Sequence, residues 1–421
     1  MMDSKIKKRS STILLILICG FVYFTAYFTR KSLAITLANI VETTALTKEQ
    51  LGLALTGLFI VYGVAQLFSG MIADRVNPKF LIFMALGVSS LMNIGLFFTV
   101  NPYVIVALWS INGLAQAFVW PPIVRFAAYN FNNRDYDKGI NVITSSGYLG
   151  QCFLCLASAL FCHFLGYKSL FLFAGILGLL VAILWILYTI RIPYEKPVRN
   201  VEKKEEPIKD KPKTHLFFNF VMIFILLSII TQGILRDGIE SWTPTFITAS
   251  FALDSTQAIM FSLILPLSAF GFIQLASFIY KRKLHNPILL AIIVYGICAL
   301  LLVFLKRFSS SNAWIVLVLI ALVYGSIAST NVILISFLPI YFKDTGRIST
   351  VAGVLNAIIY AGSAISGYGF AKLITNYGWD FGITMWLVVG AIGLLSIAVV
   401  YRKWNGRYQW KIKNNEEIDK V

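Results

Sequence analysis

The sequence predicts an all-α integral membrane protein whose twelve transmembrane helices form two pseudo-symmetric six-helix halves. Of the 421 residues, 58% are hydrophobic and 13% are charged, and the mean hydropathy is +0.77. A soluble protein of this size needs polar residues on its surface, whereas lipid accepts an apolar exterior. Backbone groups in lipid must pair within the protein, and the apolar runs lack the alternation of a barrel, so we expect helices.

Twelve apolar runs have the lengths that membrane spans need. The first follows four basic residues, as in a signal peptide, but it is too long and no cleavage site follows, so we expect it to be retained. An even number of spans places both termini on one side. The predicted spans are 11–39, 48–73, 79–100, 102–129, 139–163, 167–190, 215–248, 256–280, 288–305, 312–342, 348–374 and 379–401.

The basic residues are distributed unevenly between the two sides of these spans. If the N-terminus is inside, 27 of the 36 Lys and Arg residues lie in cytoplasmic segments and five lie at outer ends or loops. This bias is typical of multi-pass proteins, so we expect a cell (cytoplasmic) membrane location with both termini cytoplasmic. It also accounts for the net charge of +17 without a nucleic-acid partner. The expected partners are the lipid bilayer and a small anionic substrate, and we expect a monomer.

A charged, proline-containing segment at 191–214 is predicted to be a cytoplasmic linker. It separates an N-terminal half, 1–190, from a C-terminal half, 215–421. Several landmarks recur at an offset near 207 residues, which indicates a duplicated six-helix unit. Parallel repeats of this kind characterise a major transporter architecture, with the binding site between the halves. The recurring pairs are Arg30 and Arg236, Asn77-Pro78 and Asn286-Pro287, and Gly139 and Gly346.

Two arginines are predicted to lie at similar depths inside the membrane. Arg30 follows Arg9 by 21 residues, and Arg236 follows Lys213 by 23. An unpaired cation there costs at least ~2.5–3.5 kcal/mol, so we expect a function. Two guanidinium forks that face each other suit phosphate or carboxylate. As alternatives, Arg30 reaches the outer interface or Arg236 pairs locally with an acid.

Asp237 and Glu240 follow Arg236 on the same predicted span. They neutralise the arginine in an empty site, or one of them binds a proton and couples transport to it. Other polar and aromatic residues in the spans are candidates for the same site, although aromatic belts and helix packing explain many such residues. These candidates are Tyr23, Tyr27, Lys31, Tyr62, Gln66, Gln116, Trp120, Tyr148, Asn331, Asn356 and Tyr360.

The turn after the second span contains Gly70, Asp74, Arg75 and Lys79. The glycine is expected to let helices approach, and the charges are expected to form a latch that holds one conformation. The five cysteines lie in apolar runs, so we expect neither a metal site nor another cofactor. No catalytic constellation or nucleotide-binding loop is present, so an enzyme is not expected.

The stretch from Gly70 to Lys79 resembles the loop signature of the major facilitator superfamily. Three further motifs resemble the organophosphate:phosphate antiporter family, which includes glycerol-3-phosphate and hexose-phosphate transporters. They are Tyr23-x-x-x-Tyr27-x-x-Arg30-Lys31, Gln116-x-x-x-Trp120-Pro121-Pro122-x-x-Arg125 and Arg236-x-Gly238-Ile239-x-x-Trp242-x-Pro244-Thr245.

This resemblance implies exchange of an organic phosphate for inorganic phosphate by a rocker-switch, alternating-access cycle. Arg30 and Arg236 would hold the substrate phosphate. The sequence departs from the family in its fifth span, where the family's histidine is missing, and at Gln66, where the glycerol-3-phosphate carrier has lysine. A proton-coupled symporter or exporter of a carboxylate, sugar or drug is the alternative, and a transporter-like sensor is a third.

Overall fold

The computed structural model describes residues 2–131, 133–192, 220–338 and 348–413, and within these ranges the regular secondary structure is helical. Gly346 and all but the first two residues of the predicted linker at 191–214 lie outside the described residues. The elements are α1 (Met2–Thr43), α2 (Lys48–Arg75), α3 (Pro78–Phe97), α4 (Pro102–Gln116), α5 (Trp120–Asn130), α6 (Asn133–Phe164), α7 (Tyr167–Thr189), α8 (Phe220–Phe251), α9 (Ser255–Phe261), α10 (Ile264–Arg282), α11 (Pro287–Phe308), α12 (Ala313–Val332), the π-helical turn η2 (Ile333–Phe337), α13 (Ile348–Ala364), the π-helical turn η4 (Ile365–Gly369) and α14 (Phe370–Lys413).

The described residues contain eleven stretches that are long and apolar enough to cross a membrane. The last stretch, Gly353–Tyr401, has 49 residues and would rise about 73 Å as one helix, more than twice the hydrocarbon thickness. The chain turns within it at Gly378, where φ is 77° and ψ is 175°. Glycine adopts this positive φ readily, so the helix can break at this one residue. The break divides the stretch into two helices, each of which crosses the membrane once. The prediction of twelve spans is therefore confirmed.

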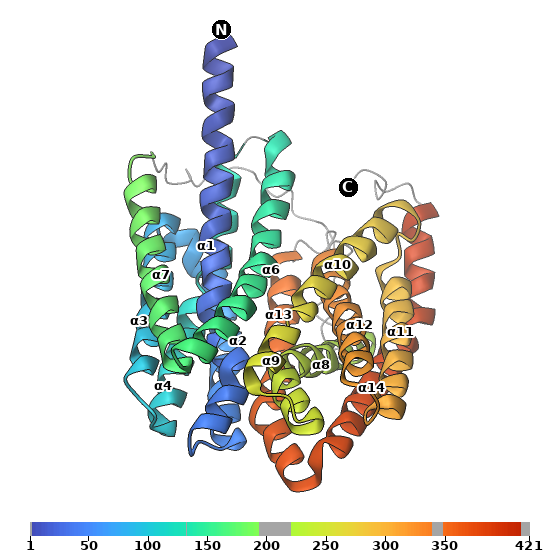
Figure 1. Ribbon diagram of the computed structural model, residues 1–421. Coiled ribbons are helices and arrows are strands. Elements are labelled where there is room, and N and C mark those ends of the chain that lie inside the picture. Colours follow the sequence, from blue (N-terminus) through green and yellow to red (C-terminus); the bar gives the residue numbers. More distant parts are fainter. Residues whose placement is uncertain (1, 132, 193–219, 339–347, 414–421) are drawn as a thin grey trace.

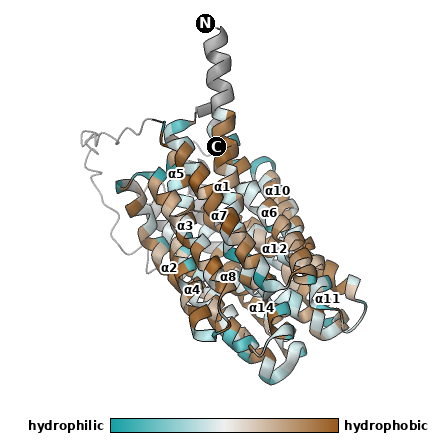
Figure 2. Ribbon diagram, turned by 60° about the vertical axis from the view of Figure 1, so that its left-hand side comes forward, coloured by the Kyte–Doolittle hydropathy of each residue, from teal (hydrophilic) through white to brown (hydrophobic). Residues whose placement is uncertain are grey.

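Large apolar side chains cover the outside of the bundle. Leu184 on α7 is 61% exposed and Leu395 on α14 is 65% exposed. Figure 2 shows hydrophobic residues along the helices, with hydrophilic residues gathered mainly toward their ends. This surface suits lipid rather than water.

The helices form two groups that pack side by side (Figure 1). Helices α1 to α7 make one group and α8 to α14 the other, and the start of α1 and the end of α14 lie at the same end of the molecule. Contacts between the groups join α2 to α13 and η4, α1 to α8, and α6 to α9 and α10.

Asn-Pro pairs begin equivalent helices in the two groups. Asn77 caps α3 by accepting a hydrogen bond from the backbone N–H of Lys79, and Pro78 takes the first helical position. Asn286 caps α11 in the same way before Pro287. Asparagine suits the cap and proline the first turn, where its missing N–H is not needed. The repeated Asn-Pro landmark thus has the same structural cause in both places.

A hydroxyl group from one half enters a helix of the other half at the end opposite the chain termini. Thr56 Oγ1 on α2 donates to the carbonyl of Ala364 at 2.7 Å and accepts from the backbone N–H of Tyr368 at 2.9 Å. These two groups would bond each other directly in an α-helix. The inserted hydroxyl therefore accounts for the π-helical turn η4. Nearby, Asn39 of α1 donates to Ser255 at the start of α9 at 2.7 Å.

Candidate functional site

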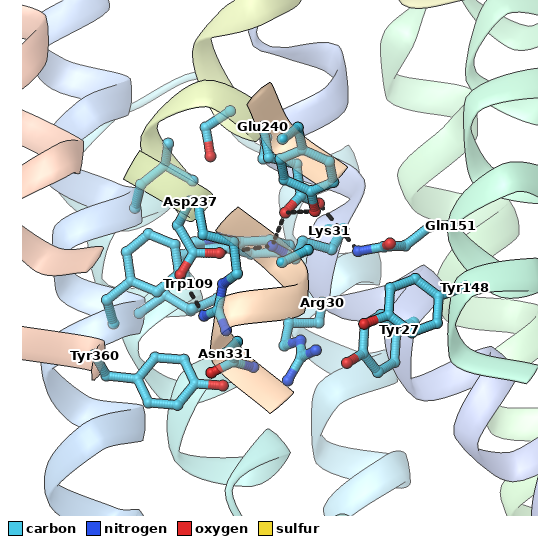
Figure 3. A pocket seen from close by; sticks show the side chains of 18 residues that line it. Tyr27, Arg30, Lys31, Trp109, Tyr148, Gln151, Asp237, Glu240, Asn331 and Tyr360 are labelled. Carbon is cyan, nitrogen blue, oxygen red and sulfur yellow. Dashed lines mark hydrogen bonds and ion pairs between the residues drawn. The ribbon is translucent and has the colours of Figure 1, made fainter. Parts of the chain in front are cut away.

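A cavity lies between the two halves, with about 710 Å³ of space free of protein atoms, part of it open to the surroundings. Its walls come from α1, α2, α4 and α6 on one side and from α8, α12 and α13 on the other. Figure 3 shows charged and aromatic side chains from both sides pointing toward one another. Nine of the predicted site residues line it, namely Tyr27, Arg30, Lys31, Tyr148, Arg236, Asp237, Glu240, Asn331 and Tyr360.

Arg30 lies between aromatic rings and has no acidic partner within ion-pair distance in the described part of the chain. Its guanidinium carbon is 4.2 Å from the centroid of the Tyr27 ring and 5.6 Å from that of Tyr62. Its buried Nε has no hydrogen-bond partner. Arg30 therefore lines the cavity rather than reaching the outer interface, and the ring faces of Tyr27 and Tyr62 lie against its charge.

Arg236 has an acidic partner beside it in the chain. Its Nη2 donates to Asp237 Oδ2 at 2.7 Å, and its guanidinium carbon is 5.9 Å from the Tyr360 ring. The local pairing that the sequence left open is thus made with Asp237 and not with Glu240. The remaining N–H groups of a guanidinium can still serve a ligand.

Lys31 connects the two halves through both carboxylates. Its Nζ lies 2.9 Å from Glu240 Oε2 and 3.3 Å from Asp237 Oδ1. Asp237, which is only 2% exposed, also accepts from the Ser363 hydroxyl. Pairing and hydrogen bonding of this kind reduce the cost of burying charge.

Glu240 on α8 accepts hydrogen bonds from side chains of three other helices, α1, α6 and α12. Besides Lys31 of α1, Gln151 of α6 donates to its Oε1 at 3.0 Å and Tyr324 of α12 donates to its Oε2 at 2.9 Å. Arg236 and Glu240 are four residues apart, so they share a face of α8, and α8 presents both charges to the cavity.

The charges in the cavity do not balance. Three cations, Arg30, Lys31 and Arg236, face two carboxylates, Asp237 and Glu240, so one positive charge is left over. The pairing pattern assigns this excess to Arg30. An uncompensated cation at this depth costs at least ~2.5–3.5 kcal/mol on insertion scales. The arrangement therefore suits an anion.

Six other predicted residues do not line the cavity. Tyr62 and Tyr23 lie behind its wall, with the Tyr62 ring 4.2 Å from Tyr360 and the Tyr23 ring 5.0 Å from Tyr27. Trp120 packs against Tyr23 at 4.8 Å. The remaining three are Gln116, Asn356 and Gln66, whose buried Oε1 has no hydrogen-bond partner among the described residues.

Gln116 belongs to a buried polar network within the first half. Its amide donates to Thr29 Oγ1 at 3.0 Å and to Ser89 Oγ at 2.7 Å, and Ser89 donates to Asn112 at 2.7 Å. Interhelical hydrogen bonds of this kind join α1, α3 and α4. Thr29 immediately precedes Arg30 on α1, so the hydrogen bond from Gln116 to Thr29 helps to fix the position of the helix that carries Arg30.

Residues that the sequence analysis missed complete the site. Gln151, Trp109 and Tyr324 line the cavity, and Ser363 reaches Asp237. Two of them carry a usable signal, since Gln151 lies three residues after Tyr148 and Tyr324 lies seven before Asn331. Both spacings keep residues on one helix face.

The predicted latch residues lie away from the cavity. A Cβ added at Gly70 would meet no atom within 4 Å, so no close helix approach requires glycine there in this conformation. Arg75 is exposed, and the side chain of Asp74 lies outside the described residues. Lys79 is buried and its Nζ donates to the carbonyl of Ile192. The latch stays a prediction.

Comparison with known proteins agrees with this architecture. A family profile described as Major Facilitator Superfamily matches residues 19–367. A probable hexose phosphate transport protein of Chlamydia trachomatis is 21% identical over 93% of this chain and 90% of its own length. The glycerol-3-phosphate transporter of Bacillus subtilis is 24% identical over 59% of each chain. A solved bacterial homologue of the human lysosomal transporter Spinster has a TM-score of 0.74 at 15% identity, covering 94% of this chain and 98% of that one.

Proposed function

Because the chain belongs to the major facilitator superfamily, we propose that this multi-pass membrane transporter exchanges an organic phosphate ester for inorganic phosphate. The observation that carries the proposal is Arg30, a guanidinium that has no acidic partner among the described residues and lines the cavity together with Arg236 of the other half. Relatives named as hexose phosphate and glycerol-3-phosphate transporters support the same substrate class.

The phosphate group would bind between the two arginines. Each guanidinium offers a planar fork that matches two phosphate oxygens, and charge-assisted hydrogen bonds are shorter and stronger than neutral ones. Asn331 and Tyr360 line the same part of the cavity and supply further polar groups. An anion there neutralises the charge that the cavity leaves unbalanced.

The unbalanced charge also explains why exchange would be favoured over net flow. Closing an empty cavity on both sides encloses an uncompensated guanidinium, whereas closing a loaded cavity encloses a neutralised one. Inorganic phosphate and a phosphate ester share the group that neutralises Arg30. Either ligand would therefore lower the barrier to the conformational switch. The empty carrier would stay open to the side on which it released its ligand.

The switch itself would be a rocking of one half against the other. We infer that the described arrangement is closed at the end where Thr56 enters η4 and that this end faces outside, with both termini cytoplasmic. Reopening that end requires Thr56 to withdraw, after which the carbonyl and N–H that it bridges can bond each other. The carrier would act as a monomer in the cell membrane.

A proton-coupled symporter or exporter is the second candidate, because Asp237 and Glu240 place two carboxylates in the cavity. The two candidates differ in what drives them. An exchanger needs phosphate on the far side of the membrane and no proton gradient, whereas a symporter needs the gradient.

Counterflow in liposomes tests the proposal. Purified protein is reconstituted in vesicles loaded with phosphate, and uptake of labelled phosphate is measured with and without a proton gradient. We expect uptake that requires internal phosphate and persists when an uncoupler removes the gradient. Protein-free vesicles and vesicles loaded with sulfate are the controls. Uptake that follows the gradient and ignores internal phosphate would contradict exchange and favour the proton-coupled carrier.

A further inference from the structure

A second hollow, the side chamber, adjoins the main cavity. It lies between α1, α6, α8 and α10, and about 370 Å³ of its space, part of it open to the surroundings, is free of protein atoms. Lys31, Gln151 and Glu240 line both spaces, so their bonded side chains form the partition between them. The other walls of the chamber are mostly apolar, with Ile35, Leu154, Cys155, Leu265 and Pro266 among them.

The partition carries an unused hydrogen-bond acceptor. Gln151 is only 6% exposed, and its amide nitrogen donates to Glu240, but its Oε1 has no hydrogen-bond partner within the described ranges. Leaving a buried acceptor unpaired is unfavourable, so this group requires an explanation, and a ligand or a water molecule that pairs with it is one. A ligand hydroxyl is a donor of the right kind. The apolar walls suit the carbon atoms that bear such hydroxyls.

The side chamber lies within reach of a ligand that is anchored at Arg30. Ile35 follows Arg30 by five residues on α1, which corresponds to about 7.5 Å along the helix axis. A phosphate ester held by its phosphate at Arg30 can extend its organic group over this distance along Ala34, which also lines both spaces beside the partition. Inorganic phosphate has no such group and would leave the chamber empty.

We propose that the side chamber is the subsite for the hydroxylated carbon portion of the transported ester, with Gln151 as a specificity-determining residue that accepts a hydrogen bond from it. The proposal rests on the proposed exchange function, because it assigns the part of the substrate that the arginines do not hold. It predicts that the two ligands of the exchanger respond differently to changes in the chamber.

A filling substitution tests this difference. Cys155 is 4% exposed and lines the chamber only, so Cys155→Leu reduces its volume without touching the arginines. Cys152→Leu is the matched control, because Cys152 lies one turn earlier on α6 and lines neither space. Binding of inorganic phosphate and of a hexose phosphate is measured by tryptophan fluorescence of the purified protein, since Trp109 lines the main cavity.

We expect Cys155→Leu to weaken hexose phosphate binding about tenfold and to change phosphate binding less than twofold. Leu265→Ala, which enlarges the chamber, provides a second variant, and we expect it to improve binding of bulkier esters relative to phosphate. Equal losses for both ligands, or no loss for either, in a folded Cys155→Leu protein would overturn the subsite. Failure of the wild type to bind phosphate or to show counterflow would instead refute the exchange function itself.

Discussion

Replacing Arg30 with lysine separates charge from geometry in the cavity. Lysine keeps the positive charge but replaces a planar fork with a single ammonium group, so bidentate contact with a phosphate is lost. One charge-assisted hydrogen bond is worth about 1.5 kcal/mol or more. Weaker stacking on the Tyr27 ring, 4.2 Å from the guanidinium, adds about 0.5 kcal/mol. The sum of about 2 kcal/mol corresponds to a roughly 30-fold rise in the Kd for phosphate.

The assay is equilibrium binding of inorganic phosphate to the purified protein, with melting temperature as a check of folding. Arg282→Lys is the matched control, because Arg282 also stacks on a ring, 5.0 Å from Phe278, but is exposed outside the cavity. We expect this control to bind phosphate as the wild type does. A folded Arg30→Lys protein whose Kd stays within twofold of the wild-type value would refute the role of the fork.

Three further predictions concern stability and the switch. Asp237→Asn removes one carboxylate partner from Lys31 and Arg236, which are 12% and 15% exposed, and should lower the free energy of unfolding by about 3 kcal/mol. In the same detergent melts Asp380→Asn, at a side chain that is 80% exposed, should cost under about 1 kcal/mol. Gly233→Ala places a Cβ 2.1 Å from a carbonyl of α13 and should cost about 3 kcal/mol, while Gly296→Ala meets no atom within 4 Å and should stabilise by about 0.5–1 kcal/mol. Thr56→Val removes both hydrogen bonds to η4 and should favour opening of that end by about 2 kcal/mol. A cysteine introduced into the cavity, in a background without the native cysteines, should then react faster with a reagent added from outside than it does in Thr56→Ser. Equal labelling rates would count against the proposed closure at η4.

The sequence predicted the fold well because hydropathy and charge bias act locally along the chain. Spans, their number and the Asn-Pro starts of α3 and α11 can all be read from short windows. The π-helical turn η4 could not be predicted in this way. Its cause is Thr56, which lies more than 300 residues away in the chain, and a local window contains no trace of it.

The site was predicted in part. The depth of Arg30 and Arg236 follows from counting residues along a span, so their presence in one cavity was foreseeable. The pairing of Lys31 with Asp237 and Glu240 was not, because these residues are 206 and 209 positions apart and no periodicity links different helices. Gln116 shows the opposite error, since a polar residue in a span looks the same in sequence whether it faces a ligand or a neighbouring helix.

The repeat explains why Arg30 alone remains unbalanced. Arg30 and Arg236 hold equivalent positions in the two halves, but Arg236 is followed by Asp237 whereas Arg30 is followed by Lys31. The second half therefore carries two carboxylates against one arginine, and Lys31 of the first half reaches across to both. These ion pairs join the two halves and involve both carboxylates that line the cavity. Arg30 is therefore left without an acidic partner among the described residues, and under the proposed function a ligand anion would pair with it.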